Sequence, residues 1–280
     1  MSNSAQSVKD KLKNISREKN VDFNSVMRFY TYDRFVERLS KSKYKDNFIL
    51  KGGFYLSKLF GLDNRSTMDI DTAIRKTKFT EENLIVMINE IISIDVGDNV
   101  KFKIEKTELI REEDEYGGLR ITINFMLENI KDKFHIDLAT GDPIYPRPDN
   151  YKYESLIGDE IYKVWSYNLE TILAEKIETI LSKLETSSRM KDYYDIYLIY
   201  KFKFDTISKE KFRGSVEKTF KKRKFDADLM TNLSIVKESK VLRERWLSYS
   251  RKNSYARDVE FEETLECLEK LIDILILHVI

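Results

Sequence analysis

Apolar and polar residues alternate with two different periods along this chain, and the period changes near residue 160. Strict alternation at 119–127 and 133–139 predicts half-buried strands. A spacing of three to four residues at 24–41 predicts an amphipathic helix instead. The same reasoning predicts further strands at 47–50, 67–75 and 101–110, and helices at 54–60 and 80–92, the last capped by Thr80. Residues 1–20 are polar and form either a frayed end or a first surface helix.

The second part of the chain has a different pattern. Beyond about residue 160 the periodicity is mainly helical, and all three prolines fall at 140–150, where they end the run of strands. A chain of 280 residues is long enough for two domains of ordinary size. We therefore predict an α+β fold, with a mixed sheet in a domain at 1–155 and a mainly helical domain at 156–280.

Two carboxylates one residue apart lie in the strand predicted at 67–75. Asp69 and Asp71 share a face of that strand, because side chains i and i+2 point the same way. Asp137, on the polar face of a later strand, supplies a third carboxylate. Clustered carboxylates repel one another unless a cation lies between them, and Mg²⁺ binds carboxylate and phosphate oxygens together. The set predicts a two-metal site; a solvated strand face or a capping pair is the alternative.

A glycine pair, Gly52-Gly53, follows the short strand at 47–50. Glycine lets the backbone approach a bulky anion closely, because it has no side chain. The pair is therefore predicted to admit a triphosphate, with Lys51 or Arg65 neutralising the phosphate charge.

Two charged residues in the second part occupy positions that should face a core. Lys176 lies within the apolar stripe of a helix predicted at 169–184, with Glu175 and Glu178 on the opposite side. Asp192 lies on the apolar side of the next helix. A buried charge is costly without an opposite charge, so Lys176 is predicted to contact a triphosphate and Asp192 to fix its ammonium. A lysine that reaches water from the edge of the stripe, or an ordinary buried ion pair, are the alternatives.

The net charge of +1 conceals a basic segment. Residues 201–257 contain 17 Lys and Arg against 7 Asp and Glu, a local net charge of +10. The aromatic residues interleaved with these cations are Phe220, Phe225, Trp246, Tyr249 and Tyr255. Cations bind a phosphate backbone and aromatic rings stack on unpaired bases, so the segment is a candidate RNA surface. A solvated helix face with core aromatics is the alternative.

Composition excludes several other kinds of site. The single cysteine, Cys267, excludes a disulfide framework and a cysteine-based zinc site, and two histidines exclude a histidine-rich metal cluster. His135 shares a face with Asp137 and is either a general base or, as we expect, structural. The N-terminal residues lack the apolar stretch of a signal peptide, and the last apolar run is too short to span a bilayer, so we expect a cytoplasmic protein that does not bind membranes.

Several short motifs resemble those of the AbiEii/AbiGii family of nucleotidyltransferase toxins in their order and spacing. They are Leu50-Lys51-Gly52-Gly53 with Arg65 and Thr67, Asp69-Ile70-Asp71, His135-Ile136-Asp137, Leu173-Ala174-Glu175-Lys176-Ile177 and Arg189-Met190-Lys191-Asp192-Tyr193-Tyr194-Asp195. The resemblance extends from about residue 30 to residue 200 and does not include the last part of the chain.

The resemblance implies a DNA polymerase β-like nucleotidyltransferase domain followed by a helical domain. It also implies the toxin role in a type IV toxin–antitoxin system linked to abortive infection and phage defence. In such an enzyme Asp69 and Asp71 would hold Mg²⁺, Lys176 would contact the triphosphate and Asp192 would complete the motif. The broader superfamily often has Gly-Ser where this chain has a glycine pair. Ser57, Ser66 or Thr67 would then supply the missing hydroxyl.

We therefore expect a metal-dependent nucleotidyltransferase that moves a nucleotide from an NTP to an RNA acceptor, tRNA by the resemblance, and releases pyrophosphate. Asp69 and Asp71 would bridge two Mg²⁺ ions, and Asp137 would bind the catalytic one. RNA would bind at 201–257, and the cognate antitoxin would act without a stable complex. We expect Asp69→Ala or Lys176→Ala to relieve growth arrest without unfolding the protein. Two alternatives stay open: transfer to a small hydroxyl substrate, and non-catalytic binding of nucleotides or RNA.

Overall fold

A computed structural model describes residues 5–110 and 117–276 of the chain. The segment between the strands predicted at 101–110 and 119–127, expected to be a polar loop, lies almost wholly outside the described residues. The chain divides into two compact units, Met1–Gly141 with Asp149–Tyr167, and Asp142–Pro148 with Asn168–Ile280. This division falls after Tyr167, later than the boundary predicted at residue 155, because two further strands follow the proline segment.

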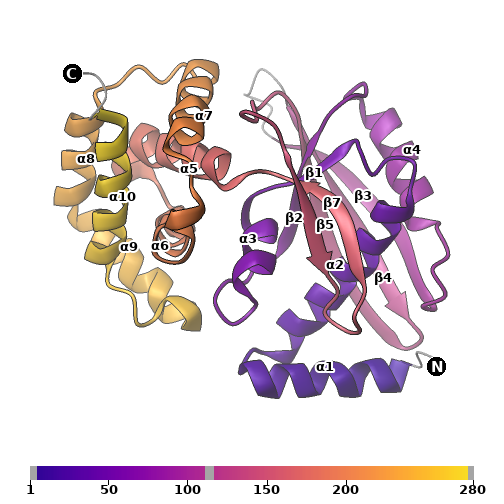
Figure 1. Ribbon diagram of the computed structural model, residues 1–280. Coiled ribbons are helices and arrows are strands. Elements are labelled where there is room, and N and C mark those ends of the chain that lie inside the picture. The colour runs from indigo at the N-terminus through magenta and orange to yellow at the C-terminus, as the bar shows by residue number, and fades with distance from the viewer. Residues whose placement is uncertain (1–4, 111–116, 277–280) are drawn as a thin grey trace. The chain divides into compact units, whose positions relative to one another are not determined.

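The first unit, drawn from indigo to pink in Figure 1, joins a seven-stranded sheet to helices. Its described helices are α1 (Ala5–Lys19), α2 (Phe23–Lys41), α3 (Gly52–Phe60) and α4 (Glu81–Ile92). Its strands are β1 (Phe48–Leu50), β2 (Asp69–Ile74), β3 (Val100–Ile110), β4 (Gly118–Leu127), β5 (Ile130–Ala139), β6 (Asp149–Glu154) and β7 (Ile161–Ser166). The polar N-terminal segment is thus a helix, and the predicted elements up to β5 are confirmed within a few residues.

The strands follow the order β3-β4-β5-β2-β1-β7-β6. β2 pairs with β5 in parallel and with β1 antiparallel, while β1 pairs with β7 in parallel. The sheet is therefore mixed, and the α+β fold is confirmed. The sequence pattern does not predict β6 or β7, because the prolines at 140–150 indicate the end of the strands and helical periodicity begins at about residue 160. β6 and β7 pair with each other as a hairpin, and only the pairing of β7 with β1 is long-range.

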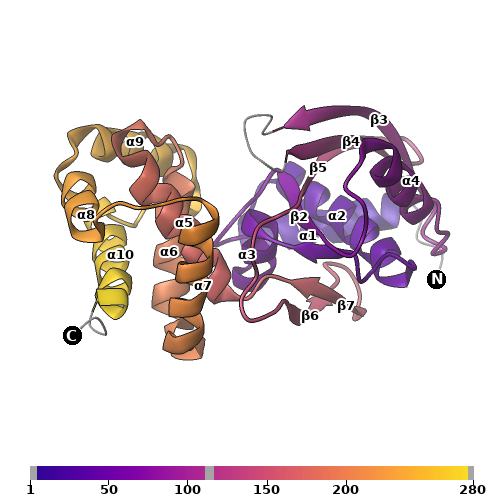
Figure 2. The same cartoon turned by 90° about the horizontal axis from the view of Figure 1, so that it is seen from above.

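Helix α2 packs against the apolar face of this sheet (Figure 2). The rings of Phe35 on α2 and Phe134 on β5 lie 6.1 Å apart, and Tyr32 contacts the same Phe134 ring at 5.5 Å. On the same face of the sheet, a fully buried row runs across β4, β5 and β2, formed by Ile121, Ile136 and Ile70. Burying this face forces the alternate residues of these strands onto the opposite face, which is the polar one.

A buried carboxylate on α2 anchors the β6–β7 hairpin. Asp33 is fully buried and accepts hydrogen bonds from the Tyr153 hydroxyl and the Leu156 backbone N–H. Lys58 lies 3.3 Å from the same carboxylate and partly neutralises it. Burial, and then the charge of Asp33, raise the pKa of Tyr153 well above its ordinary value, so its hydroxyl keeps the proton that it donates.

Local signals in the sequence account for the ends of several helices. The side chain of Asp22 accepts a hydrogen bond from the Ser25 backbone N–H at 2.9 Å and caps α2. Thr80 caps α4 in the same way, as predicted, at 3.4 Å from the Asn83 N–H. Gly61 ends α3 with a φ of 89°, a conformation that suits glycine.

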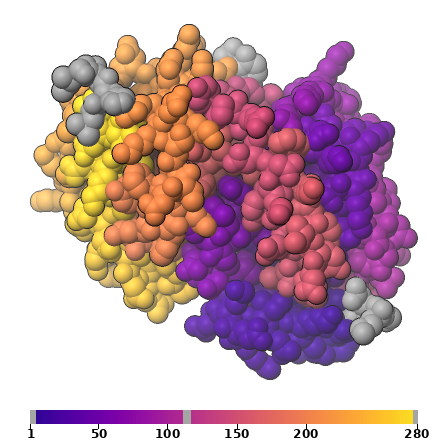
Figure 3. Space-filling model, in the orientation of Figure 1, coloured from indigo at the N-terminus to yellow at the C-terminus, as the bar shows by residue number. Residues whose placement is uncertain are grey.

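The second unit is helical in its described residues. It contains α5 (Leu169–Lys183), α6 (Met190–Lys203), α7 (Lys209–Lys222), α8 (Leu229–Glu238), α9 (Lys240–Lys252) and α10 (Phe261–Ile276). Tyr193, Trp246 and Phe261 form an aromatic core, with ring centroids 5.2 Å and 5.6 Å from that of Phe261. The aromatic Trp246 of the basic segment is therefore core, not a surface for bases. Figure 3 shows α7 in orange and α10 in yellow at the surface of this unit.

The segment 142–148 belongs to the helical unit because Asn168 and Gly214 hold it there. The Asn168 side chain caps α5 and donates to the carbonyls of Tyr145 and Arg147 at 2.8 Å and 3.0 Å. The Tyr145 ring lies so close to Gly214 on α7 that any side chain there would collide with it. In the described part of the chain, no helix combines the length and apolar character needed to cross a lipid bilayer.

Candidate active site

The three predicted carboxylates lie on neighbouring strands of the first unit, on one face of the sheet. The parallel register of β2 and β5 places Asp71 opposite Asp137, and Asp69 opposite His135. Because residues that oppose each other across a ladder point to the same face, all three carboxylates point away from the buried isoleucine row. The Asp69 and Asp137 side chains are 31% and 17% exposed, so solvent reaches both.

Arg120 on β4 lies against this group of carboxylates. It opposes Asp137 in the antiparallel β4–β5 register. Its Nε and Nη2 donate to the two carboxylate oxygens of Asp137, both at 2.7 Å, and Nη2 lies 3.7 Å from Asp69 Oδ2. The hydrogen bond to Asp137 raises the pKa of Arg120 above its ordinary value, with smaller contributions from Asp69 and Asp71. Sequence reasoning missed Arg120, although strand alternation places it on the polar face.

The glycine pair gives the start of α3 its close approach to β2. Gly52 has a φ of 55°, and a Cβ built there would lie 2.9 Å from Asp71 Oδ2. A Cβ on Gly53 would lie 2.9 Å from Arg65 Nη2 and 3.1 Å from Thr67 Oγ1. The Lys51 backbone N–H donates to the Asp71 carbonyl at 3.0 Å. The pair thus makes room for three side chains of this chain; whether it also admits a triphosphate stays a prediction.

The other predicted nucleotide-binding residues differ in accessibility. Lys51 and Arg65 are 5% and 2% exposed, and the Lys51 ammonium lies 4.8 Å from the centre of the Tyr167 ring. Ser57 is 1% exposed, and its hydroxyl donates to the Gly53 carbonyl at 2.6 Å. Thr67 is only half-buried, so among the hydroxyls proposed to replace the missing serine, it is better placed than Ser57.

His135 contacts Thr122 on the neighbouring strand. Its Nδ1 and the Thr122 hydroxyl lie 3.0 Å apart, and Thr122 is buried. The imidazole therefore has a partner within the sheet. This contact supports the structural reading of His135.

The cluster formed by Asp69, Asp71 and Asp137 has the oxygen donors that a hard cation prefers. Three carboxylates on one face supply the oxygen ligands that Mg²⁺ takes, and Gly52 leaves space beside Asp71. As the side chains stand, however, no three His, Cys, Asp or Glu residues among 5–110 and 117–276 are placed to hold a metal ion. Arg120 donates a hydrogen bond to each oxygen of Asp137.

Lys176 and Asp192 form a buried ion pair in the second unit, together with Asp195. The Lys176 ammonium lies 2.7 Å from Asp192 Oδ1 and 2.6 Å from Asp195 Oδ2. Arg189 contacts the other oxygen of Asp192 at 2.7 Å. Burial alone would lower the pKa of Lys176, but the two carboxylates raise it above its ordinary value. Asp195 was absent from the predicted set, although it lies one turn after Asp192 on the same face.

Glu178, predicted on the side of α5 opposite Lys176, is also buried, because Arg223 at the end of α7 lies against it. Glu178 is 6% exposed, and its carboxylate lies 2.6 Å from Arg223 Nη1. Arg223 also lies 3.7 Å from both Asp142 and Glu175. Arg223 therefore pairs with carboxylates inside the second unit, because α7 packs beside α5 and brings opposite charges together. Lys221 and Lys224, on either side of the pair Lys222-Arg223, are exposed.

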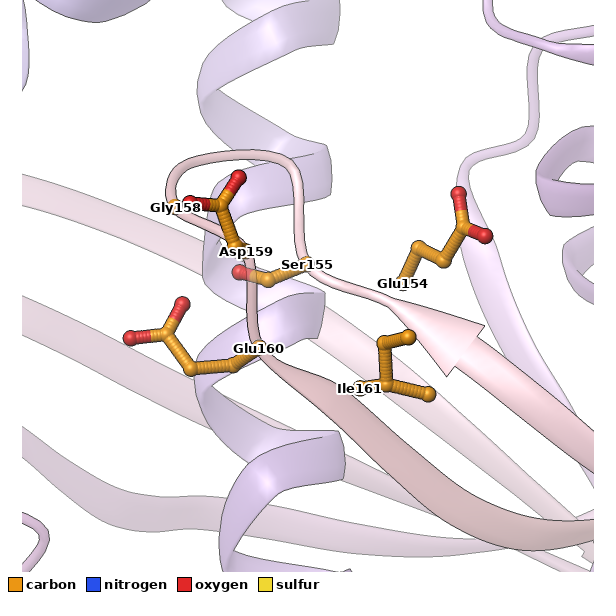
Figure 4. A pocket seen from close by; sticks show the side chains of 6 residues that line it. All are labelled: Glu154, Ser155, Gly158, Asp159, Glu160 and Ile161. Carbon is orange, nitrogen blue, oxygen red and sulfur yellow. The ribbon is translucent and has the colours of Figure 1, made fainter.

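A depression of about 290 Å³ lies at the loop between β6 and β7. Its lining side chains are Glu154, Ser155, Gly158, Asp159, Glu160 and Ile161. Figure 4 shows that the three carboxylates point in different directions. Because its lining carries acids and no cation, this depression is unsuited to the phosphates of a nucleotide.

Comparison with known proteins gives the family and the fold. Residues 34–267 match the family model described as nucleotidyl transferase AbiEii toxin, type IV TA system. The crystal structure of JHP933 from Helicobacter pylori is similar, with a TM-score of 0.54, 13% identity, and coverage of 91% of this chain and 92% of that one. A candidate nucleotidyltransferase from H. pylori has a TM-score of 0.50 at 15% identity, covering 91% and 96%. No curated protein matches the chain.

Proposed function

Since the chain belongs to the AbiEii family of nucleotidyl transferase toxins of type IV toxin–antitoxin systems, we propose that it transfers a nucleotide from an NTP to a hydroxyl acceptor at the Asp69–Asp71–Asp137 carboxylates. The observation that carries the proposal is the β2–β5 register, which places Asp71 opposite Asp137 with Asp69 on the same face. A binding module has no need of three clustered acids beside a tight glycine turn.

In this proposal Asp69, Asp71 and Asp137 hold divalent cations, which we take to be two Mg²⁺ ions. When bound, Mg²⁺ supplies charge neutralisation at the phosphates and lowers the pKa of the attacking hydroxyl. The protein orients its carboxylates by the rigid strand ladder, and Gly52 keeps the backbone of α3 close to Asp71. Thr67 would supply the hydroxyl contact to phosphate, and Lys51 and Arg65 the positive charge near the glycine pair. Pyrophosphate would leave.

We retain Lys176 and Asp192 as residues required for function. Their contacts support a positioning role, because the Lys176 ammonium is already neutralised by two buried carboxylates. Contact between Lys176 and a triphosphate stays a prediction. Chemical-shift or crosslinking data with a γ-phosphate analogue would test it.

For the acceptor we propose RNA, specifically tRNA, bound through exposed cations of residues 201–257. Lys218, Lys221 and Lys224 on and after α7, and Lys240, Arg251 and Lys252 on α9, are exposed. Such cations bind a phosphate backbone. Modified tRNA would halt translation and arrest growth. The cognate antitoxin would act without a stable complex, which size-exclusion chromatography of the co-expressed pair would check.

One experiment tests the proposal. The protein is incubated with Mg²⁺, each labelled NTP, total tRNA and a set of small hydroxyl acceptors. Label in tRNA that is abolished by Asp71→Asn supports the proposal. Label in a small molecule alone favours transfer to a small substrate. Nucleotide binding without transfer to any acceptor favours a non-catalytic binding protein, and both of these results overturn the RNA assignment.

A further inference from the structure

Arg120 is a cation in direct contact with two of the candidate carboxylates, Asp69 and Asp137, and the proposed function gives it no role. It is 34% exposed, so it lies at the surface of the site and not beneath it. Its fork-like contact with Asp137 uses both carboxylate oxygens at 2.7 Å. The same guanidinium is 3.7 Å from Asp69.

We propose that Arg120 is a built-in counter-ion that takes the place of the divalent cation at Asp137 until metal and nucleotide displace it. The proposal rests on the metal dependence proposed above. In the resting protein the guanidinium relieves the repulsion between carboxylates on adjacent strands. A metal ion that binds the lone pairs of Asp137 facing Arg120 then displaces at least one of the two arginine hydrogen bonds.

Two cations, the Arg120 guanidinium and a divalent metal ion, compete for one ligand, the Asp137 carboxylate. A bidentate arginine–carboxylate pair is a strong, geometrically specific contact. A cation held at Asp137 would also lie close to the arginine charge, and like charges a few ångströms apart repel strongly in a partly buried site. Arg120 therefore weakens metal binding to the free protein. Phosphate groups of a nucleotide would offer the displaced guanidinium new acceptors, so metal and nucleotide would bind cooperatively.

A purely structural pair would behave differently. If Arg120 only braces β4 against β5, its removal lowers stability and leaves metal affinity unchanged or weaker. If it competes with metal, its removal tightens metal binding. The direction of the change in affinity therefore separates the two roles.

The test is a titration of nucleotide-free protein with Mn²⁺, followed by calorimetry or electron paramagnetic resonance. For Arg120→Gln we expect the dissociation constant to fall at least about tenfold relative to the unaltered protein. Arg120→Lys keeps the positive charge but loses the bidentate contact, so its dissociation constant for Mn²⁺ should lie between those of the unaltered protein and Arg120→Gln. Should the glutamine variant fail to fold, the lysine variant decides the question on its own.

Two controls locate the effect. Lys133→Gln removes a cation from the same face of β5, four residues from Asp137, and should leave Mn²⁺ affinity unchanged. In an Asp137→Asn background, which lacks the bidentate pair, Arg120→Gln should tighten Mn²⁺ binding less than it does in the unaltered background. Equal or weaker Mn²⁺ binding in Arg120→Gln overturns the competition while leaving the metal proposal intact. Absence of Mn²⁺ binding in every variant overturns the metal dependence of the proposed function, and this proposal with it.

Discussion

Gly52 and Asp71 are packed so closely that a methyl group on the glycine would lie 2.9 Å from the aspartate Oδ2. Gly52 also has a φ of 55°, which disfavours any residue with a side chain. We expect Gly52→Ala to displace the Asp71 carboxylate and abolish nucleotide transfer. The unfolding free energy should fall by about 2–4 kcal/mol, from backbone strain and overpacking together.

Gly97→Ala is the matched control for that change. Gly97 has a φ of 72°, yet nothing lies within 4 Å of a Cβ built on it. It should therefore lose only the backbone contribution, about 1–2 kcal/mol, and keep full transfer activity. Urea unfolding and transfer assays of both variants measure this difference; equal losses of activity would refute the role of the Gly52–Asp71 contact.

Lys176 neutralises two buried carboxylates, so its removal should destabilise the protein. We expect Lys176→Met to lower the unfolding free energy by about 3–5 kcal/mol, because Asp192 and Asp195 are left without their shared cation. Denaturant unfolding measures this. Adding Asp195→Asn should recover part of the loss. Lys183→Met, exposed on the same helix, should change stability by less than about 0.5 kcal/mol.

This result would revise the expectation drawn from the sequence that Lys176→Ala relieves growth arrest while the protein stays folded. A Lys176 variant would lose toxicity either because it no longer performs its function or because it unfolds and its soluble level falls. The soluble level of each variant has to be measured beside its toxicity. Asp69→Asn, at a partly exposed position, is the better test of function.

The stability of the protein should depend on pH through the ionisation of Asp192. Burial by itself would raise its pKa, but Lys176 and Arg189 hold the pKa of Asp192 well below the ordinary value. A carboxylate with a lowered folded-state pKa contributes stability above its unfolded pKa of about 4, and that contribution is lost as the pH falls below it. The unfolding free energy of the unaltered protein should fall between pH 6 and pH 3. That of Asp192→Asn should fall less steeply over the same range. Parallel curves would contradict this.

Cys267 should be inert in the folded protein. It is 1% exposed, and burial raises the pKa of its thiol to about 11, so almost no thiolate is present at pH 8. We expect no labelling by iodoacetamide at pH 8 in native buffer and rapid labelling in denaturant. Fast labelling of the native protein would show that α10 opens.

The RNA surface can be separated from the internal cations of the basic segment. Lys221→Gln with Lys224→Gln should weaken tRNA binding. It should also reduce the slope of the logarithm of the binding constant against the logarithm of the salt concentration by about one unit for each lysine. Arg223→Gln should instead lower stability, because Glu178 loses its partner. Lys101→Gln with Lys103→Gln on β3 removes the same charge and should leave tRNA affinity unchanged. Filter binding at several salt concentrations measures the tRNA affinity of all three variants, and urea unfolding measures the stability of Arg223→Gln.

The local elements follow from the sequence because hydrophobic period and capping chemistry act over a few residues. The alternation of β2 alone places Asp69 and Asp71 on one face, and the helical spacing of α5 and α6 places Lys176 and Asp192 inward. The strands β6 and β7 were missed; β7 joins the sheet through β1, which lies more than a hundred residues earlier, and β6 pairs with β7.

What the sequence determined by itself is therefore the identity of the carboxylates, the face on which each lies, and the motifs of the family. Tertiary structure decided which strands are neighbours, and through the β4–β5–β2 ladder it placed Arg120 against Asp137 and Asp71 opposite it. It likewise decided that Arg223 pairs internally and that Lys176 meets two carboxylates. The physical reason is that side-chain direction depends on local backbone geometry, whereas the partner of a charge depends on chain segments brought together only when the core is buried.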